Sequence, residues 1–357
     1  MKSAYLPSLI YTGSEERSGL AVLADDDIIQ DLVPVTEIPS GYERIDLSGK
    51  ILAPGFIDLQ IYGGNGHLFS QQPTTESLEA TYQYSLDGGA THFCITIATN
   101  SREVVSAGIR AVKAYWEKGG KGLLGLHLEG PFINKEKRGA HLEAFVHTPA
   151  RKEILELLEE GKGVIRIMTL APECCDPELI HLLQENGVIV SAGHSNATYE
   201  QATRAFNGGI TLATHLYNAM SPLQSRAPGM VGAIYDHRLV MSSMVVDGVH
   251  TDLAAVRISK KIMGDRLFLI TDAVAETAEG PYPHVFQGDR YCMPDGTLSG
   301  SALTMMKAVK NCVDHCGISL EEACRMASTY PAKAAGLDNQ LGYIRKGYEA
   351  AFTTISI

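Results

Sequence analysis

The chain has 357 residues, with 30 Lys or Arg and 41 Asp or Glu, so its formal net charge is −11. These charges are spread along the chain without a basic block, which disfavours nucleic acid or an anionic membrane surface as a partner. Hydrophobic residues make up 45% and charged residues 20%. This composition excludes a disordered chain, and no apolar run approaches the roughly 20 residues of a membrane-spanning helix.

The first 50 residues predict short strands and turns. Alternating stretches at 20–23 and 28–35 are interrupted by acidic residues, prolines and Gly41. The N-terminal residues lead into no signal-peptide core. The seven cysteines are scattered in a chain that is too long to need a disulfide framework. We therefore expect reduced thiols and a cytoplasmic protein.

From residue 51 onward, short apolar runs alternate with amphipathic stretches. Near-continuous apolar runs indicate strands that are buried on both faces, as in a parallel sheet. Two of the intervening segments, 148–160 and 176–186, have the pattern of helices. Eight such strands interleaved with helices over about 220 residues match a (β/α)8 barrel. The eight runs are 51–59, 93–98, 123–128, 164–170, 188–192, 210–213, 239–246 and 267–270.

The pattern changes again after residue 272. A Gly/Pro-rich stretch at 280–300 precedes two predicted helices, at 303–316 and 319–328. The tail from residue 337 has turn residues and an apolar finish, so we expect it to pair with the N-terminal strands. The predicted fold is α/β: a TIM-like (β/α)8 barrel of residues 53–335, and a small β domain built from both chain ends, residues 1–52 and 336–357.

Reactive side chains follow most of the predicted strands. Catalytic groups lie at the C-terminal ends of the strands in barrels of this kind, so these side chains are expected to meet at one rim. Each alone has a structural explanation, since a histidine can be a hydrogen-bonded scaffold residue and a carboxylate can cap a helix. Six suitable strand ends out of eight are harder to dismiss. They carry Asp58, Gln60 and Tyr62; His127 and Glu129; His194; His215 and Asn218; Asp247 and His250; and Asp272.

One carboxylate and two imidazoles of this set suit a divalent metal ion. Glu129, His194 and His215 offer the ligand types that Zn²⁺ or Fe²⁺ takes, with one position open for water. Such an ion lowers the pKa of bound water toward about 7. Asp272 can then accept the proton and pass it to a leaving group. This set indicates metal-assisted hydrolysis.

The motifs resemble those of the amidohydrolase superfamily. The segment APGFID at 53–58 is similar to its first barrel strand. Four others more specifically resemble the N-acetylglucosamine-6-phosphate deacetylases: HLEGPF at 127–132, SAGHS at 191–195, THLYNAM at 214–220 and LITDA at 269–273. GTLSGS at 296–301 and MASTYPA at 326–332 fit the same family. The similarity extends from about residue 45 to about residue 348.

The resemblance implies a role for each matching residue. It places the metal ligands on Glu129, His194 and His215 and the acid/base carboxylate on Asp272. It implies that His141 polarises the scissile carbonyl, and that the products are glucosamine 6-phosphate and acetate. Substrate contacts are implied for His141, Asn218, Ala219, Arg226 and His250.

The family arginine that matches Arg226 pairs with the sugar phosphate, for which a planar guanidinium is apt. It comes from the other subunit of a dimer in that family. We therefore expect a homodimer in which Arg226, and in an extended version His250 as well, reaches the neighbour's site.

Gln60 and Tyr62 stand where most amidohydrolases carry a His-x-His pair for a second metal ion. An amide and a phenol are poor ligands for divalent ions beside imidazole, so we predict one ion per chain. One branch of the deacetylases has glutamine and asparagine there, and Tyr62 departs from that branch. The C-terminal segment also departs from the family, because it is shorter and has EAAF at 349–352. The small domain is therefore expected to be incomplete or packed differently.

Three other functions stay open. The first is the same chemistry on another sugar phosphate, such as N-acetylgalactosamine 6-phosphate. The second is hydrolysis of a cyclic amide, which the missing first-strand histidines and the segment around Asn218 disfavour. The third is a non-catalytic sugar-phosphate sensor, which the intact Glu129, His194, His215 and Asp272 set disfavours. Four further histidines are interpreted as surface or structural residues: His92, His181, His284 and His315.

Overall fold

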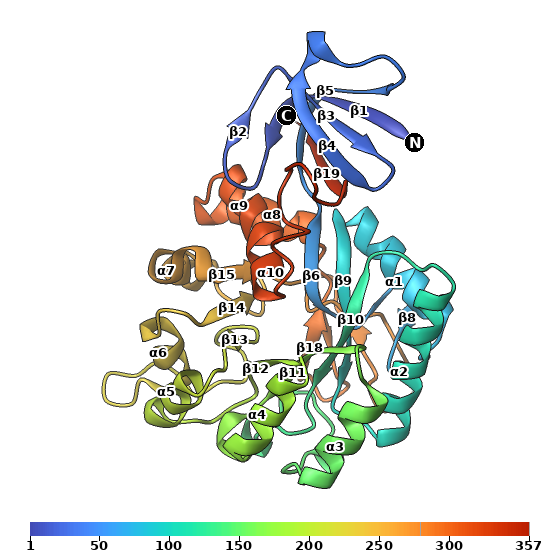
Figure 1. The fold of residues 1–357 in the computed structure, drawn as a ribbon. Coiled ribbons are helices and arrows are strands. Elements are labelled where there is room, and N and C mark those ends of the chain that lie inside the picture. Colours follow the sequence, from blue (N-terminus) through green and yellow to red (C-terminus); the bar gives the residue numbers. More distant parts are fainter. Residues whose placement is uncertain (279, 357) are drawn as a thin grey trace.

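The computed structural model describes residues 1–278 and 280–356 and divides them between a small β-sheet and a barrel (Figure 1). The small sheet has the order β19-β5-β1-β3-β4, with β2 paired to β1. Its strands are β1 (Lys2–Tyr11), β2 (Glu16–Arg17), β3 (Leu20–Asp25), β4 (Ile28–Pro34), β5 (Glu43–Pro54) and β19 (Phe352–Ser356), with a 3-10 turn, η1, at Val35–Glu37.

The C-terminal tail joins the N-terminal strands as the sequence predicts. Strand β19 pairs antiparallel with β5, with Phe352 opposite Pro54 and Ser356 opposite Lys50. The Thr353 hydroxyl donates to the Gly89 carbonyl at 2.6 Å and so ties this strand to the barrel. The tail therefore supplies an edge strand of the small sheet, although its sequence departs from the family pattern. Ile357, the last residue of the predicted segment, lies outside the described residues.

Eight parallel strands form the barrel in the predicted order along the chain. Its first and last strands are joined near their ends, where Asp272 N–H donates to the Gln60 carbonyl and Tyr62 N–H donates to the Ala273 carbonyl, both at 2.9 Å. The α/β barrel prediction is confirmed. The strands are β6 (Phe56–Ile61), β9 (Ala90–Ala98), β10 (Leu123–Glu129), β11 (Ile165–Leu170), β12 (Ile189–Ala192), β13 (Leu212–Ala213), β14 (Met241–Met244) and β15 (Leu267–Leu269).

The first apolar run, predicted as one strand over 51–59, is divided between the two sheets. Residues 51–54 continue β5 of the small sheet, and β6 begins at Phe56. Gly55 lies between them, and a Cβ there would lie 2.1 Å from Thr91 Oγ1. The chain passes so close to the next barrel strand that only glycine fits without a shift at this junction.

Helices surround the barrel on its outer side (Figure 1). Their sequence signals are visible locally, for example where the Asp176 carboxylate caps the N-terminus of α4 by accepting from Glu178 N–H. The helices are α1 (Thr75–Asp87), α2 (Arg102–Glu117), α3 (Arg151–Glu160), α4 (Pro177–Glu185), α5 (Tyr199–Asn207), α6 (Gly229–Asp236), α7 (Leu253–Met263), α8 (Met305–Cys316), α9 (Leu320–Ala327) and α10 (Thr329–Ala334). Short 3-10 turns are η2 (Lys135–Lys137), η3 (Glu143–Phe145), η4 (Pro172–Cys174) and η5 (Gly264–Arg266).

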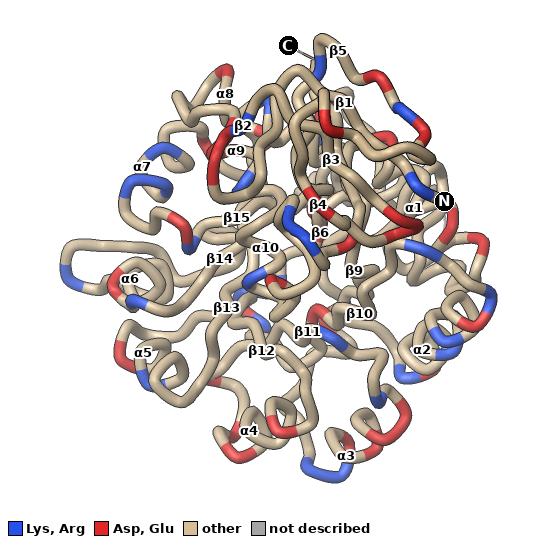
Figure 2. The backbone as a smooth tube through the Cα atoms, turned by 45° about the horizontal axis from the view of Figure 1, so that its top comes forward, with Lys and Arg blue, Asp and Glu red and all other residues tan. Residues whose placement is uncertain are grey.

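The Gly/Pro-rich stretch after β15 forms a small antiparallel sheet. It contains β16 (Val285–Phe286), β17 (Arg290–Cys292) and β18 (Leu298–Ser301). A second short hairpin, β7 (Gly63–Gly64) and β8 (His67–Leu68), follows β6. Basic and acidic residues alternate around the periphery (Figure 2). Within the described ranges, none of the helices has the length and apolar character that crossing a membrane requires.

Candidate active site

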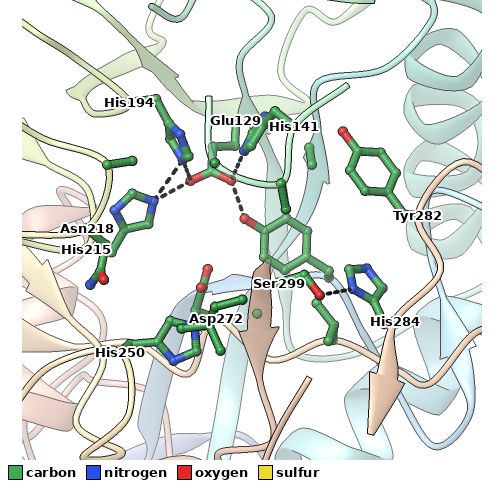
Figure 3. Close-up of a pocket in the computed structure, with 18 of the residues that line it drawn as sticks. Glu129, His141, His194, His215, Asn218, His250, Asp272, Tyr282, His284 and Ser299 are labelled. Carbon is green, nitrogen blue, oxygen red and sulfur yellow. Dashed lines mark hydrogen bonds and ion pairs between the residues drawn. The ribbon is translucent and has the colours of Figure 1, made fainter. Parts of the chain in front are cut away.

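A pocket of about 190 Å³ lies at the C-terminal ends of the barrel strands (Figure 3). Glu129 is the last residue of β10, and His194 and His215 each follow a strand by two residues. Asp272 follows β15 by three residues. All four line this pocket. The parallel strands thus bring together side chains that are up to 143 positions apart in the sequence, because every strand ends at the same rim.

Glu129, His194 and His215 have the spacing of metal ligands. His215 Nε2 lies 2.9 Å from Glu129 Oε1 and 3.1 Å from His194 Nε2, and His194 Nε2 lies 3.3 Å from the same oxygen. Tetrahedral zinc with bonds of about 2.0–2.1 Å separates its ligands by about 3.3 Å. The three side chains are also buried. These separations fit the ligands of one divalent ion.

The hydrogen bonds of His194 assign its ring nitrogens. Nδ1 lies 2.8 Å from the Lys137 carbonyl, which can only accept, so this nitrogen carries the proton. The lone pair is then on Nε2, which faces Glu129. An outer partner that fixes a histidine in this way is typical of metal sites. His194 is thus prepared as a ligand.

His141 has the opposite assignment. Its Nδ1 faces the Thr99 backbone N–H at 3.3 Å and the Thr99 hydroxyl at 2.7 Å. A backbone N–H can only donate, so Nδ1 holds the lone pair and Nε2 the proton. Burial, followed by the nearby His194, lowers the pKa of His141 to about 4. Although His141 lies close enough to Glu129 and His194 to join a metal cluster, its neutral ring presents an N–H donor to the pocket.

The two carboxylates of the site differ in charge preference. Burial opposes ionisation of Glu129, but the facing imidazoles, His194 first, hold its pKa well below the usual range. Burial, then the negative charge of Glu129 and Asp58, raises the pKa of Asp272 well above its usual range. One carboxylate is thus suited to binding a cation and the other to exchanging a proton.

Gln60 and Tyr62, predicted as the remnant of a second metal site, lie beside Glu129. Gln60 Nε2 lies 2.9 Å from Glu129 Oε1, 2.9 Å from the Tyr62 hydroxyl oxygen and 2.8 Å from Asp272 Oδ1. The Tyr62 hydroxyl donates to Glu129 Oε2. Burial, together with Glu129 and Asp272, raises the pKa of Tyr62 well above its usual value, so its proton stays in place.

The predicted substrate residues fall into two groups. Asn218, Ala219 and His250 line the pocket beside Asp272. His250 Nδ1 forms a hydrogen bond with Asp247 Oδ2 at 2.6 Å. The imidazole of His250 lines the pocket of its own chain. Arg226 is exposed on the loop between β13 and α6 and is not among the residues that line this pocket.

Backbone strain is concentrated at this rim. His194, His215, Ala219 and Asp272 have φ angles of 47°, 38°, 51° and 56°. Residues with side chains rarely adopt this left-handed region, and they persist in it where the surrounding structure over-determines them. His194, His215 and Asp272 adopt this conformation within three residues of the ends of their strands, where their side chains line the pocket.

Sequence reasoning missed part of the pocket wall. His284, interpreted as a surface or structural residue, is buried and lines the pocket next to Ser299, with its Nδ1 3.0 Å from Ser299 Oγ. Burial lowers the pKa of His284 to about 4, so the ring is neutral at pH 7. Tyr282 lines the same wall (Figure 3). The available signal was their place in the segment directly after β15, since such segments border the site in barrels.

Glu173 is a second residue that the sequence did not single out. Its carboxylate accepts from Asn134 Nδ2 at 2.9 Å, from Asn196 N–H at 2.7 Å and from the Ser195 hydroxyl at 2.6 Å. These partners lie on the loops that follow β10 and β12. Glu173 thus holds together the two loops that adjoin Glu129 and His194.

Comparison with known proteins matches the whole described fold. The model of the amidohydrolase family matches residues 51–356, and the model of the NagA composite domain matches residues 4–52. An N-acetylglucosamine-6-phosphate deacetylase of Haemophilus influenzae is 39% identical over 97% of this chain and 93% of its own length. An N-acetylgalactosamine-6-phosphate deacetylase of a Shewanella species is 35% identical over 85% of this chain and 79% of its own length.

Two solved structures have the same architecture. N-acetylglucosamine-6-phosphate deacetylase from Pasteurella multocida superimposes with a TM-score of 0.96 at 35% identity, covering 100% of this chain and 96% of that one. A mutant of the Mycobacterium smegmatis enzyme in complex with N-acetyl-D-glucosamine-6-phosphate gives a TM-score of 0.90 at 29% identity, with coverages of 99% and 95%. The fold and the rim of reactive side chains define a barrel hydrolase. The chain belongs to the amidohydrolase family, and within it to the N-acetylglucosamine-6-phosphate deacetylases.

Proposed function

We propose that this protein hydrolyses the acetamide of N-acetylglucosamine 6-phosphate to glucosamine 6-phosphate and acetate. The observation that carries the proposal is the convergence of Glu129, His194 and His215 in one buried cluster, in a pocket that His141 and Asp272 also line. The similarity to named deacetylases over nearly the full chain supports the substrate class. A phosphorylated amino sugar and seven free cysteines suit the cytoplasm, which we propose as the location.

One divalent ion per chain, Zn²⁺ or Fe²⁺, would be held by Glu129, His194 and His215. When bound, such an ion polarises the carbonyl and lowers the pKa of water toward about 7. Asp272 accepts the proton of the attacking water and returns it to the departing amine. His141 donates its Nε2 proton in a hydrogen bond to the carbonyl oxygen, where negative charge develops.

The sugar phosphate is held on the side of the pocket that Asn218, Ala219 and His250 line. Arg226 completes this subsite from the neighbouring subunit of a homodimer. Its exposure supports this role, because the loop that carries it also exposes Leu223, which is 51% accessible. Binding of the phosphate helps to position the distant amide. We further propose residues 53–335 as the catalytic domain, with 1–52 and 336–357 as the small one.

N-acetylgalactosamine 6-phosphate is the second candidate substrate. The Shewanella relative named for that sugar is nearly as similar to this chain as the Haemophilus one. The two sugars differ in the orientation of one hydroxyl group, so both would place the amide in the same way.

An acetate-release assay on a panel of N-acetyl amino-sugar phosphates, with added Zn²⁺ or Fe²⁺, tests the proposal. We expect rapid release from N-acetylglucosamine 6-phosphate and slower release from its epimer. The reverse order would favour the second candidate. A folded, metal-loaded protein that releases acetate from no member of the panel would indicate a sugar-phosphate sensor or a hydrolase of cyclic amides.

A further inference from the structure

The two carboxylate oxygens of Glu129 face different groups. Oε1 lies 2.9 Å from His215 Nε2 and 3.3 Å from His194 Nε2. Oε2 lies 3.1 Å from His141 Nε2 and accepts the hydrogen bond of the Tyr62 hydroxyl. Oε1 therefore lies beside the two proposed ligand nitrogens, with Gln60 Nε2 also 2.9 Å away. Oε2 lies between the Tyr62 hydroxyl and the His141 ring.

Tyr62 is held firmly in this place. Its backbone N–H donates to the Ala273 carbonyl at 2.9 Å where the barrel closes, and its carbonyl accepts from Phe69 N–H at 2.9 Å. The ring is 8% exposed and belongs to an apolar cluster with Leu68. The hydroxyl oxygen accepts from Gln60 Nε2 at 2.9 Å. Because the hydroxyl oxygen accepts from Gln60, its own proton is directed at Glu129 Oε2.

We propose that Tyr62 is a positioning residue that makes Glu129 a one-oxygen ligand and closes the second cation position of this barrel. The inference rests on the metal-dependent function proposed above. A carboxylate that bridges two cations needs a free oxygen for each, and here Oε2 accepts the hydrogen bond of the Tyr62 hydroxyl. Gln60 acts in the same direction, because its amide N–H groups point their positive ends toward this space.

Metal titration of the chelator-stripped protein tests this role without any substrate. We expect the wild type to bind about one Zn²⁺ per chain. Tyr62→Phe should still bind about one ion, since the ring remains, but about 10- to 100-fold more weakly because Glu129 loses its outer partner. Tyr282→Phe is the matched control. Its hydroxyl donates to the Thr99 carbonyl at 2.5 Å, so its loss should leave the affinity unchanged.

A wild-type affinity in Tyr62→Phe would overturn the proposal, and so would two ions in the wild type. In the Co²⁺-substituted protein, Tyr62→Phe frees Oε2 to approach the ion, so we expect a spectrum of higher coordination number; an unchanged spectrum would contradict the one-oxygen role. The double variant Gln60→His and Tyr62→His, checked for native circular dichroism, should gain a second ion. One ion in this folded variant would show that other groups close the position.

These outcomes are separate from those that test the reaction. A wild type that binds one ion tightly but releases acetate from no amino-sugar phosphate would refute the proposed reaction and leave the role of Tyr62 intact. An active deacetylase whose metal affinity does not depend on Tyr62 would refute the role of Tyr62 and support the proposed reaction.

Discussion

The side-chain amide of Gln60 donates to Asp272 Oδ1 at 2.8 Å. The main-chain carbonyl of Gln60 accepts from the main-chain N–H of Asp272 at 2.9 Å. The first and last strands of the barrel are joined by the second of these bonds, and the carboxylate is oriented by the first. Asp272 is therefore positioned by the closure of the barrel itself, and a group on a rigid element is held more accurately than one on a loop.

Asp272→Asn should retain the metal ion and the substrate affinity while lowering kcat by about 10²- to 10⁴-fold, the usual contribution of general acid–base catalysis. The amide has the size of the carboxylate and can still accept from Gln60, but it cannot take up and return a proton. Single-turnover kinetics and metal analysis on the same preparation check this. Substantial residual turnover would exclude Asp272 as the acid/base residue.

His141→Gln should lower kcat by about 10²- to 10³-fold, the typical effect of removing one donor to a developing oxyanion. The metal content should stay at the wild-type level, because the Thr99 N–H assigns the ring as a donor and not as a ligand. His194→Gln is the comparison and should lose the ion. A His141→Gln protein that no longer holds metal would place this histidine among the ligands.

Arg226→Ala should weaken kcat/KM for the phosphorylated substrate by about 10- to 100-fold, as expected when a hydrogen bond to a charged group is lost. The unphosphorylated N-acetyl sugar should be affected far less. Arg151→Ala, an exposed arginine on α3, serves as the control for net charge. Equal losses on both substrates would argue against a phosphate contact. A protein that sediments as a monomer would contradict the proposal that Arg226 reaches the site of the neighbouring subunit.

Asp58 predicts a dependence of stability on pH. Burial raises its pKa to about 6, against hydrogen bonds from Thr271 that lower it. The folded state therefore holds the proton more tightly than the unfolded one. The protonated Asp58 carboxyl group stabilises the folded state by up to about 3 kcal/mol. This contribution is fully present below about pH 4 and is lost as the pH rises through about 6. Compared with Asp58→Asn, the wild type should lose unfolding free energy from pH 4 to 6.5 in urea titrations. A parallel pH dependence of the two proteins would show that Asp58 does not titrate in this range.

The barrel could be predicted because its strands are buried on both faces, so each leaves an apolar run that needs no knowledge of its neighbours. The run at 51–59 shows where this reasoning ends. Its apolar residues are buried throughout, but the sheet to which they belong changes at Gly55. Membership of a sheet is decided by the partner strand, and a strand pattern contains no information about its partner.

The candidate site is likewise divided between residues that the strand pattern places and residues that only tertiary contacts place. Glu129 ends one strand and His194 lies two residues after another, so the expectation that reactive residues gather at the C-terminal ends of barrel strands was sufficient to place them together. His284 reaches the pocket from a segment that folds into its own small sheet, and its direction depends on pairings such as Val285 with Cys292. The hydrogen-bond direction that separates His141 from the ligands depends on one backbone N–H of Thr99. Both are tertiary contacts that residue types and spacing do not encode.

The pairing of β19 with β5 has a consequence for biosynthesis. The two strands are separated by about 300 positions, and a ribosome that adds about 5–20 residues per second needs about 15–60 s to make that distance. During this time the edge of β5 that will receive β19 has no strand of its own chain to pair with. Unpaired edges favour association between molecules. We therefore expect the nascent protein to depend on chaperones more than its finished form would suggest.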